Sequence, residues 1–169
     1  MHEIKNKAMI TETCFRFITV DPGLNHHTGW SIWERNDHGF KPIETGVVDA
    51  PRKDGDWSFE AFSIANKLRA WGKYCDRGFI EMPELWSGSA LSQAAAARGD
   101  LFKLSFLVGS IYTALTMVNV DSTILLPREW KGQLKKEMVD RRIWKALNKK
   151  FPNHISDAVG IGLFVIGKL

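Results

Sequence analysis

Three acidic residues and one histidine lie where a folded chain could use them in chemistry. Asp21 directly follows a short β-favouring run, and Glu81 lies inside the apolar segment 79–82. Farther along, His154 precedes Asp157 by three residues, close to the start of an apolar helical pattern. A carboxylate in an apolar strand is costly to bury unless it is paired or binds a metal. We therefore expect these four side chains, drawn from separate segments, to converge on one site.

The chemistry that such a set supports is hydrolysis of a phosphodiester with two divalent ions. Oxygen ligands suit Mg²⁺ and Mn²⁺, and two ions about 4 Å apart activate a water and stabilise the leaving oxygen. In this hypothesis Asp21 bridges both ions, and Glu81 and Asp157 each bind on one side. His154 binds a metal or orients the attacking water. The products would carry a 5′-phosphate and a 3′-hydroxyl.

Each of these residues also has an ordinary structural explanation. The Asp-Pro-Gly sequence at 21–23 is a common turn, and the helix dipole favours an acid such as Asp157 near a helix start. Glu84 competes with Glu81 for the role of second acid. The order of acid, acid and His-x-x-Asp, each at its expected element, favours the metal site over the separate explanations.

The N-terminal part of the chain predicts three strands. Residues 15–20 and 29–34 are rich in apolar, β-favouring side chains, and the turn at 21–23 ends the first of them. Residues 40–48 continue the pattern but contain Pro42, which cannot donate to a central ladder, so this strand is expected at an edge. Short connections between consecutive strands indicate an antiparallel meander.

The remainder alternates between helices and strands. A helix is expected at 58–74, where Phe62, Ala65 and Leu68 recur at helical spacing, and one long helix at 89–118. Gly99 and Gly109 in that helix predict the close approach of another element. Strands are further expected at 79–82 and 123–126, and helices at 137–148 and 155–166. The expected fold is α/β: a five-stranded mixed sheet, made of a three-strand antiparallel meander plus two parallel strands and flanked by helices.

Length and composition limit the classes of protein to which the chain can belong. The 169 residues predict a single domain, 1–169, in which 1–14 form a flexible leader. Hydrophobic residues make up 44% and charged residues 25%, as in globular proteins. No apolar run reaches the roughly 18 residues of a membrane span, and no secretory signal opens the chain, so a cytoplasmic location without membrane contact is expected. Cys14 and Cys75 provide neither a disulfide framework nor a metal spacing.

Positive charge is concentrated in one stretch of the chain. Residues 127–150 contain nine basic and three acidic residues, a net charge of +6. The whole chain carries +4, so the remainder is mildly acidic. Such a distribution is typical of a protein that binds a polyanion. A solvated helix face explains the charge alone equally well.

At these residues the chain resembles the RuvC family of Holliday junction resolvases, within the RNase H-like and retroviral integrase superfamily. The first-strand motif is hydrophobic residues, then Asp-Pro-Gly at 21–23 and Thr-Gly at 28–29. Ala-Arg-Gly at 97–99 and His-x-x-Asp-Ala at 154–158 are similar to later motifs of the family. The resemblance runs from about residue 17 to 165, nearly the whole chain.

The resemblance implies a homodimer with Mg²⁺ or Mn²⁺, two ions per site, that nicks four-way DNA junctions symmetrically. It also implies DNA contacts at Lys131, which follows Trp130 as in the family, at Arg98, and at Trp86, an aromatic residue in the loop after Glu81. Lys135 and Lys136 join this set because they lie in the basic stretch.

Departures from the family pattern leave the substrate open. The stretch between Gly99 and Lys131 is longer, and that between Lys131 and Asp157 shorter, than in bacterial resolvases. This compact form resembles phage-borne members, which would act in the cytoplasm of the host cell. The alternatives are an RNase H-like nuclease for flaps, forks or RNA–DNA hybrids, and a module that binds junctions without cutting them. An actin- or sugar-kinase-like phosphate-binding domain would need two such halves, for which 169 residues are too few.

Overall fold

The computed structural model describes residues 15–25, 27–51, 55–84 and 90–169, apart from the side chains at 91 and 92. Three strands come first, β1 (Arg16–Asp21), β2 (Gly29–Asn36) and β3 (Gly39–Val47), followed by helix α1 (Trp57–Gly72). The chain continues through β4 (Arg77–Glu81), α2 (Ala90–Ala97), α3 (Asp100–Thr116) and β5 (Asp121–Leu125). It ends with α4 (Pro127–Trp130), α5 (Lys136–Leu147) and α6 (Asn153–Val165).

The five strands form one mixed sheet in the order β3-β2-β1-β4-β5. β1 pairs antiparallel with β2, and β2 with β3, whereas β4 lies parallel to both β1 and β5. This confirms the expected meander with two added parallel strands. Pro42 lies in the edge strand β3, close to the register shift opposite Ile32 and Trp33, as its missing N–H requires.

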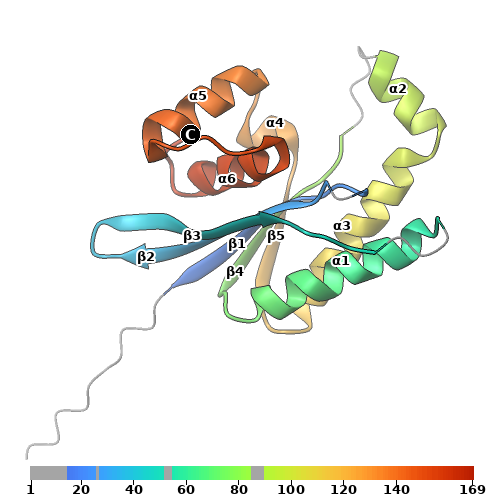
Figure 1. Cartoon of the computed structure of the whole chain (residues 1–169), viewed down its shortest axis with the longest axis horizontal. Coiled ribbons are helices and arrows are strands. Elements are labelled where there is room, and N and C mark those ends of the chain that lie inside the picture. Colours follow the sequence, from blue (N-terminus) through green and yellow to red (C-terminus); the bar gives the residue numbers. More distant parts are fainter. Residues whose placement is uncertain (1–14, 26, 52–54, 85–89) are drawn as a thin grey trace, which may run out of the picture.

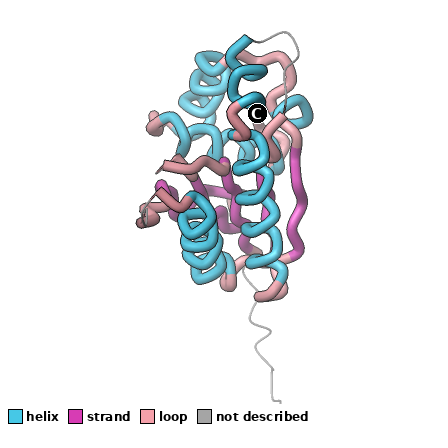
Figure 2. The backbone as a smooth tube through the Cα atoms, turned by 90° about the vertical axis from the view of Figure 1, so that its right-hand side faces the viewer, coloured by secondary structure: helices cyan, strands magenta, loops and turns pink. Residues whose placement is uncertain are grey.

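Helices cover both faces of the sheet, and a separate core fills each side (Figures 1 and 2). Because side chains alternate along a strand, Ile18 and Val20 of β1 enter the core under α1 and α3. Phe17, which directly precedes Ile18 in β1, enters the opposite core, which α6, α5 and α4 close. Figure 1 shows α5 lying outside α6, farther from the sheet.

Two expectations about helices are wrong. The long helix expected at 89–118 is two helices, because Gly99 adopts a left-handed conformation (φ 76°) that ends α2 before α3 begins. Apart from its own neighbours in the chain, no described atom lies within 4 Å of a Cβ placed on Gly99 or on Gly109, so neither glycine serves a close approach within the described structure. Phe62 shares the spacing of the buried Ala65 and Leu68 but is itself 62% exposed.

The membrane-spanning helices and the cysteines can be assessed over the described residues only. The longest described helix, α3, has 17 residues, and none of the described helices combines the length and apolarity that a membrane span needs. Cys75 is buried, and burial raises the pKa of its thiol to about 12, which keeps it protonated and unreactive. Cys14 lies outside the described residues.

Candidate functional site

Strand alternation places Asp21 and Glu81 on the same face of the sheet. In β1, Asp21 follows Phe17 and Thr19 at intervals of two, and in β4 Glu81 stands two residues after Phe79, which packs in the core under α6. The parallel register pairs Val20 with Ile80, so both acids stand one step beyond the last aligned pair. Both carboxylates therefore emerge at the carboxyl ends of adjacent central strands, where open α/β sheets collect their functional groups.

A buried polar network fixes the start of α6 against this end of the sheet. Thr19 Oγ1 donates to the carbonyl of Ala158 at 2.7 Å and lies 2.6 Å from Ser31 Oγ. Trp33 Nε1 donates to Ser31 Oγ at 2.8 Å. Each of these buried polar groups has a hydrogen-bond partner, because a buried polar atom without one is unfavourable. The network holds the residue directly after Asp157 and so sets where that carboxylate can lie.

Position 29, directly after Thr28, has room only for a glycine. A Cβ on Gly29 would lie 2.0 Å from the carbonyl oxygen of His154, which no real packing allows. Thr28 itself closes the loop after β1, because its hydroxyl donates to the carbonyl of Gly23 and accepts from the amide of Gly23. The Thr-Gly pair therefore lets α6 approach β2 and brings His154 beside the end of β1.

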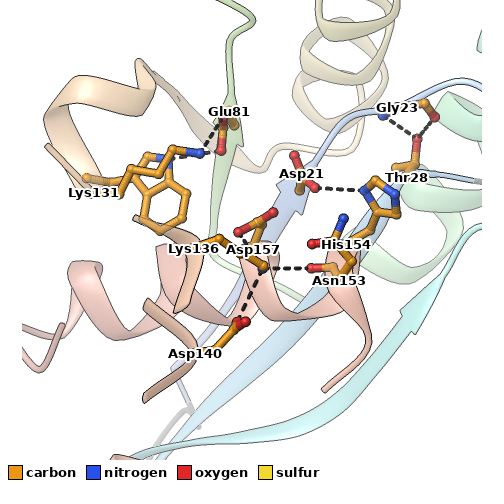
Figure 3. Close-up of polar contacts among 11 residues, drawn as sticks. Asp21, Gly23, Thr28, Glu81, Lys131, Lys136, Asp140, Asn153, His154 and Asp157 are labelled. Carbon is orange, nitrogen blue, oxygen red and sulfur yellow. Dashed lines mark hydrogen bonds and ion pairs between the residues drawn. The ribbon is translucent and has the colours of Figure 1, made fainter. Parts of the chain in front are cut away.

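Asp21 and His154 contact each other directly. His154 Nδ1 lies 3.3 Å from Asp21 Oδ2 (Figure 3). The ring of His27 lies 4.7 Å from that of His154. The pKa of Asp21 is raised, chiefly by burial and further by the negative charge of Asp157, and the hydrogen bond from His154 opposes the shift. The pKa of His154 is also raised, mainly by that hydrogen bond. An imidazolium beside this carboxylate is thus stabilised.

Glu81 is held by two consecutive residues at the end of α4. Trp130 Nε1 donates to Glu81 Oε2 at 2.9 Å, and Lys131 Nζ lies 3.5 Å from Glu81 Oε1. Burial raises the pKa of Glu81 to about 7, and repulsion from Asp21 and Asp157 adds to the shift. The short helix α4 therefore orients the second acid and supplies it with a cation.

Asp157 is paired in the same manner. Lys136 Nζ, at the start of α5, lies 2.8 Å from Asp157 Oδ1 and 3.3 Å from Asp140 Oδ1. It also donates to the carbonyl of Asn153 at 3.1 Å (Figure 3). Asp140 additionally accepts from the hydroxyl of Ser156. One lysine is thus shared between a carboxylate facing the site and a carboxylate behind it.

The oxygen atoms of these carboxylates are ligands that suit a hard divalent cation. The negative charge of Asp157 raises the pKa of both Asp21 and Glu81, and placing three like charges together is unfavourable without a cation. Among the described residues, however, no group of three Asp, Glu, His or Cys side chains is arranged ready to bind a metal. The lysines provide the reason, because Glu81 is turned to Lys131 and Asp157 to Lys136.

Of the other residues expected at the site, some lie near the carboxylates and others do not. Lys135 is exposed beside Lys136, at the N-cap of α5. Arg98 lies at the junction of α2 and α3, where it pairs with Asp100 at 3.1 Å and not with the site carboxylates. Glu84 pairs with Arg128 at 3.1 Å and contacts none of the four expected ligands among the described residues. Trp86 lies outside the described residues.

Three positioning features escaped sequence reasoning. The sequence singled out Trp130 only as the residue before Lys131, yet its indole donates to Glu81. Thr19 and Ser31 hold α6 from within apolar strands, and a polar residue in such a strand was the available signal. The pairing of Lys136 with Asp157 had no local signal, because these residues come from different helices.

Comparisons with known proteins support the fold. No family model matches the chain, and no curated protein matches it in sequence. Among solved structures, it is similar to T. thermophilus RuvC in complex with a Holliday junction substrate. The TM-score is 0.63 at 18% identity, over 89% of this chain and 91% of the other. The chain therefore has the RuvC/RNase H-like fold that its sequence motifs predict.

Proposed function

We propose that the protein is a metal-dependent, structure-specific DNA endonuclease that resolves four-way junctions by paired nicking. The observation that carries the proposal is the meeting of Asp21, Glu81, His154 and Asp157 at the ends of β1 and β4 and the start of α6. Basic residues flank this group. The fold is also that of T. thermophilus RuvC in complex with a Holliday junction substrate.

Each residue of the group has a role in this proposal. Asp21, Glu81 and Asp157 would hold Mg²⁺ or Mn²⁺, two ions per site, with His154 as a further ligand or as the group that orients the attacking water. The bound ions would supply charge neutralisation at the phosphate and a water of lowered pKa. Trp130 orients Glu81, and the Thr19 network orients Asp157 through α6. Hydrolysis would yield a 5′-phosphate and a 3′-hydroxyl.

The lysines connect this site to DNA. Lys131 and Lys136 sit directly at the carboxylates, and Lys135 is exposed next to them. A phosphodiester entering the site would therefore meet cations on the α4 and α5 side. Symmetric nicking requires two copies of the site, so we propose a homodimer. We assign its interface to an apolar groove between α1 and α3, which is lined by Phe62, Phe106 and Met117.

The decisive experiment is a cleavage assay that compares substrates. Labelled four-way junction, flap, fork, RNA–DNA hybrid and linear duplex are incubated with Mg²⁺, Mn²⁺ or EDTA. The variant Asp21→Asn is tested in parallel. We expect metal-dependent paired nicks in the junction, at least 1,000-fold slower in Asp21→Asn, since one metal ligand is lost. Junction binding by that variant should be unchanged or tighter, because a negative charge facing the phosphates is removed.

Other outcomes distinguish the alternatives. Preferential cutting of flaps, forks or hybrids would retain the nuclease and discard the junction specificity. Tight junction binding without cutting in either metal would establish a binding module. If Asp21→Asn lost binding together with cutting, the carboxylate would have a structural role in place of a metal-ligand role.

A further inference from the structure

Five exposed cations on α5 and the turn after it are not used by the candidate site. The ion pairs of the basic stretch involve Arg128, Lys131 and Lys136, and no acidic residue occurs between 141 and 152. The cations that pair with no described carboxylate are Arg141, Arg142, Lys145, Lys149 and Lys150. This segment is therefore an uncompensated positive surface, which attracts a polyanion.

An exposed indole lies within this positive surface. Trp144 is 51% exposed and lines a cavity of about 460 Å³ together with three of the cations, Arg141, Lys149 and Lys150. The chain turns back beside Trp144 because Asn148 ends α5 in a left-handed conformation (φ 50°). Lys149 then lies over the ring of Phe151, 4.9 Å from its centroid. An aromatic platform surrounded by cations is the arrangement that binds unpaired bases.

The distribution of charge orients a ligand in this cavity. Glu137 and Asp140 line one end, towards the start of α5, and Asp140 is already engaged by Lys136 and by Ser156. Arg141 lies next to Asp140, and Lys149 and Lys150 line the other end. Phosphates would therefore lie along the C-terminal side, next to Lys149 and Lys150, with a base over Trp144.

The cavity continues towards the edge of the sheet. Lys149 and Phe151 also line a second hollow of about 300 Å³, whose other wall is the edge strand β3 from Lys41 to Thr45. The two hollows share Lys149 and Phe151 as lining residues, and we refer to the pair of hollows as the trough. The first hollow lies along α5 and the turn after it, and the second lies between that turn and β3.

We propose that this trough is a second nucleic-acid site, which binds single-stranded DNA or RNA by stacking a base on Trp144. A duplex hides the faces of its bases in the stack, so it could use the cations but not the indole. The site is separate from the carboxylates and does not depend on the nuclease activity. Its role is to hold an unpaired strand close to the place where branched DNA is cut.

The test measures binding of labelled oligonucleotides in EDTA by fluorescence anisotropy. Three probes of equal length are used: oligo(dT), an abasic strand with the same phosphates, and a duplex. We expect the wild type to bind oligo(dT) about tenfold more tightly than the abasic strand. Trp144→Ala should remove this difference, whereas Trp144→Phe should retain most of it. Replacing Arg141, Lys149 and Lys150 with Gln should weaken binding of all three probes.

Matched controls separate this site from the rest of the molecule. Tyr74 is 64% exposed beside Lys73 at the far end of α1, so Tyr74→Ala should leave every affinity unchanged. The dependence on Trp144 should persist in the double variant Lys131→Met/Lys136→Met, which lacks the cations of the carboxylate site. Equal binding of oligo(dT) and the abasic strand, an unaltered affinity in Trp144→Ala, or tighter binding of the duplex would each overturn the proposal.

Discussion

The residues of the carboxylate site form two similar pairs, each with an acid and a lysine. Lys131 and Glu81 lie 3.5 Å apart, and Lys136 and Asp157 lie 2.8 Å apart. Without a metal, the lysines neutralise carboxylates that burial and mutual repulsion would otherwise destabilise. A divalent cation would compete with them for the same oxygens. Metal binding would then release the lysines towards the phosphates, which couples metal affinity to DNA affinity.

This competition predicts that removing a lysine strengthens metal binding. Lys136→Met should bind Mn²⁺ about three- to tenfold more tightly than the wild type, since one positive charge near the site is lost and the pair is partly exposed to solvent. The same variant should bind DNA more weakly. Mn²⁺ affinity is measured by titration in the absence of DNA. Lys145→Met, on the exposed face of the same helix, is the control, and an equal affinity in all three proteins would refute the competition.

The raised pKa of Glu81 predicts how the stability of the metal-free protein depends on pH. Its pKa is about 7 in the fold, against an ordinary value of 4.5, so the native state holds a proton that the unfolded chain has lost between these values. The resulting stabilisation is complete below pH 4.5 and is lost as the pH rises through 7, by up to about 3 kcal/mol. The raised pKa values of Asp21 and His154 act in the same direction.

Urea unfolding in EDTA at pH 5 and pH 8 measures this loss. We expect the wild type to be less stable at pH 8, and Glu81→Gln to show a smaller difference between the two conditions. Glu44→Gln, an exposed position on β3, should behave as the wild type. A wild type that is equally stable at both pH values, or a Glu81→Gln variant with the full difference, would contradict the account.

Among the elements, α6 and the central strands depend on each other through small residues. Gly29 of β2 admits the His154 carbonyl, and Gly162 of α6 admits the ring of Trp33, which a Cβ would approach to 2.2 Å. The helix therefore lies unusually close to the sheet at two points along its length. Close contact keeps the start of α6, with His154 and Asp157, at the ends of β1 and β4.

The contact at Gly29 predicts a loss of both stability and activity on a minimal substitution. Gly29→Ala forces the start of α6 away from β2, because the new Cβ meets backbone that cannot rotate aside. We expect unfolding to become easier by about 1–3 kcal/mol and junction nicking to fall at least tenfold at temperatures where the variant is folded. Gly46→Ala on β3 meets only the Trp30 side chain, at 3.1 Å, and should retain nicking. Equal nicking by both variants would show that the position of α6 is not critical.

Considered as a whole, the molecule presents different surfaces on its two helical layers. The α5 layer is basic, whereas the α1–α3 layer carries an apolar groove of about 610 Å³. Exposed apolar side chains border this groove, among them Phe62 at 62%, Phe106 at 50% and Met117 at 68% exposed. Contiguous exposed apolar surface of this kind commonly marks a protein interface. The groove lies on α1 and α3, across the sheet from α5 and α6 (Figure 1), so a partner there would leave the carboxylate site open.

A dimer formed through this groove predicts that one charge disrupts it. The wild type should sediment as a dimer, and Phe62→Glu as a monomer with unchanged circular dichroism, because a carboxylate buried in an apolar interface is left unpaired. Tyr74→Glu, equally exposed but outside the groove, should remain dimeric. A monomeric wild type, or a dimeric Phe62→Glu, would remove the groove as the interface.

The sequence by itself determined the strands and the fold class, and it singled out the acids proposed for the site, because these depend on local patterns. Alternating apolar residues identified the strands, Pro42 identified the edge, and the acids stood out against their apolar neighbours. The long helix expected at 89–118 was wrong, since a helix break at Gly99 depends on one backbone angle. The close approach expected at Gly99 and Gly109 was also wrong, and the short helix α4 was not predicted.

The tertiary structure alone decided how these residues are connected. Lys136 reaches Asp157 across two helices, Trp130 reaches Glu81 from a separate turn, and Thr19 reaches the carbonyl of Ala158 over 139 positions. It also decided that Trp144 is exposed among cations and that Phe62 is left outside the core. Such contacts join segments that are distant in the chain, and no periodicity within one segment encodes its distance from another.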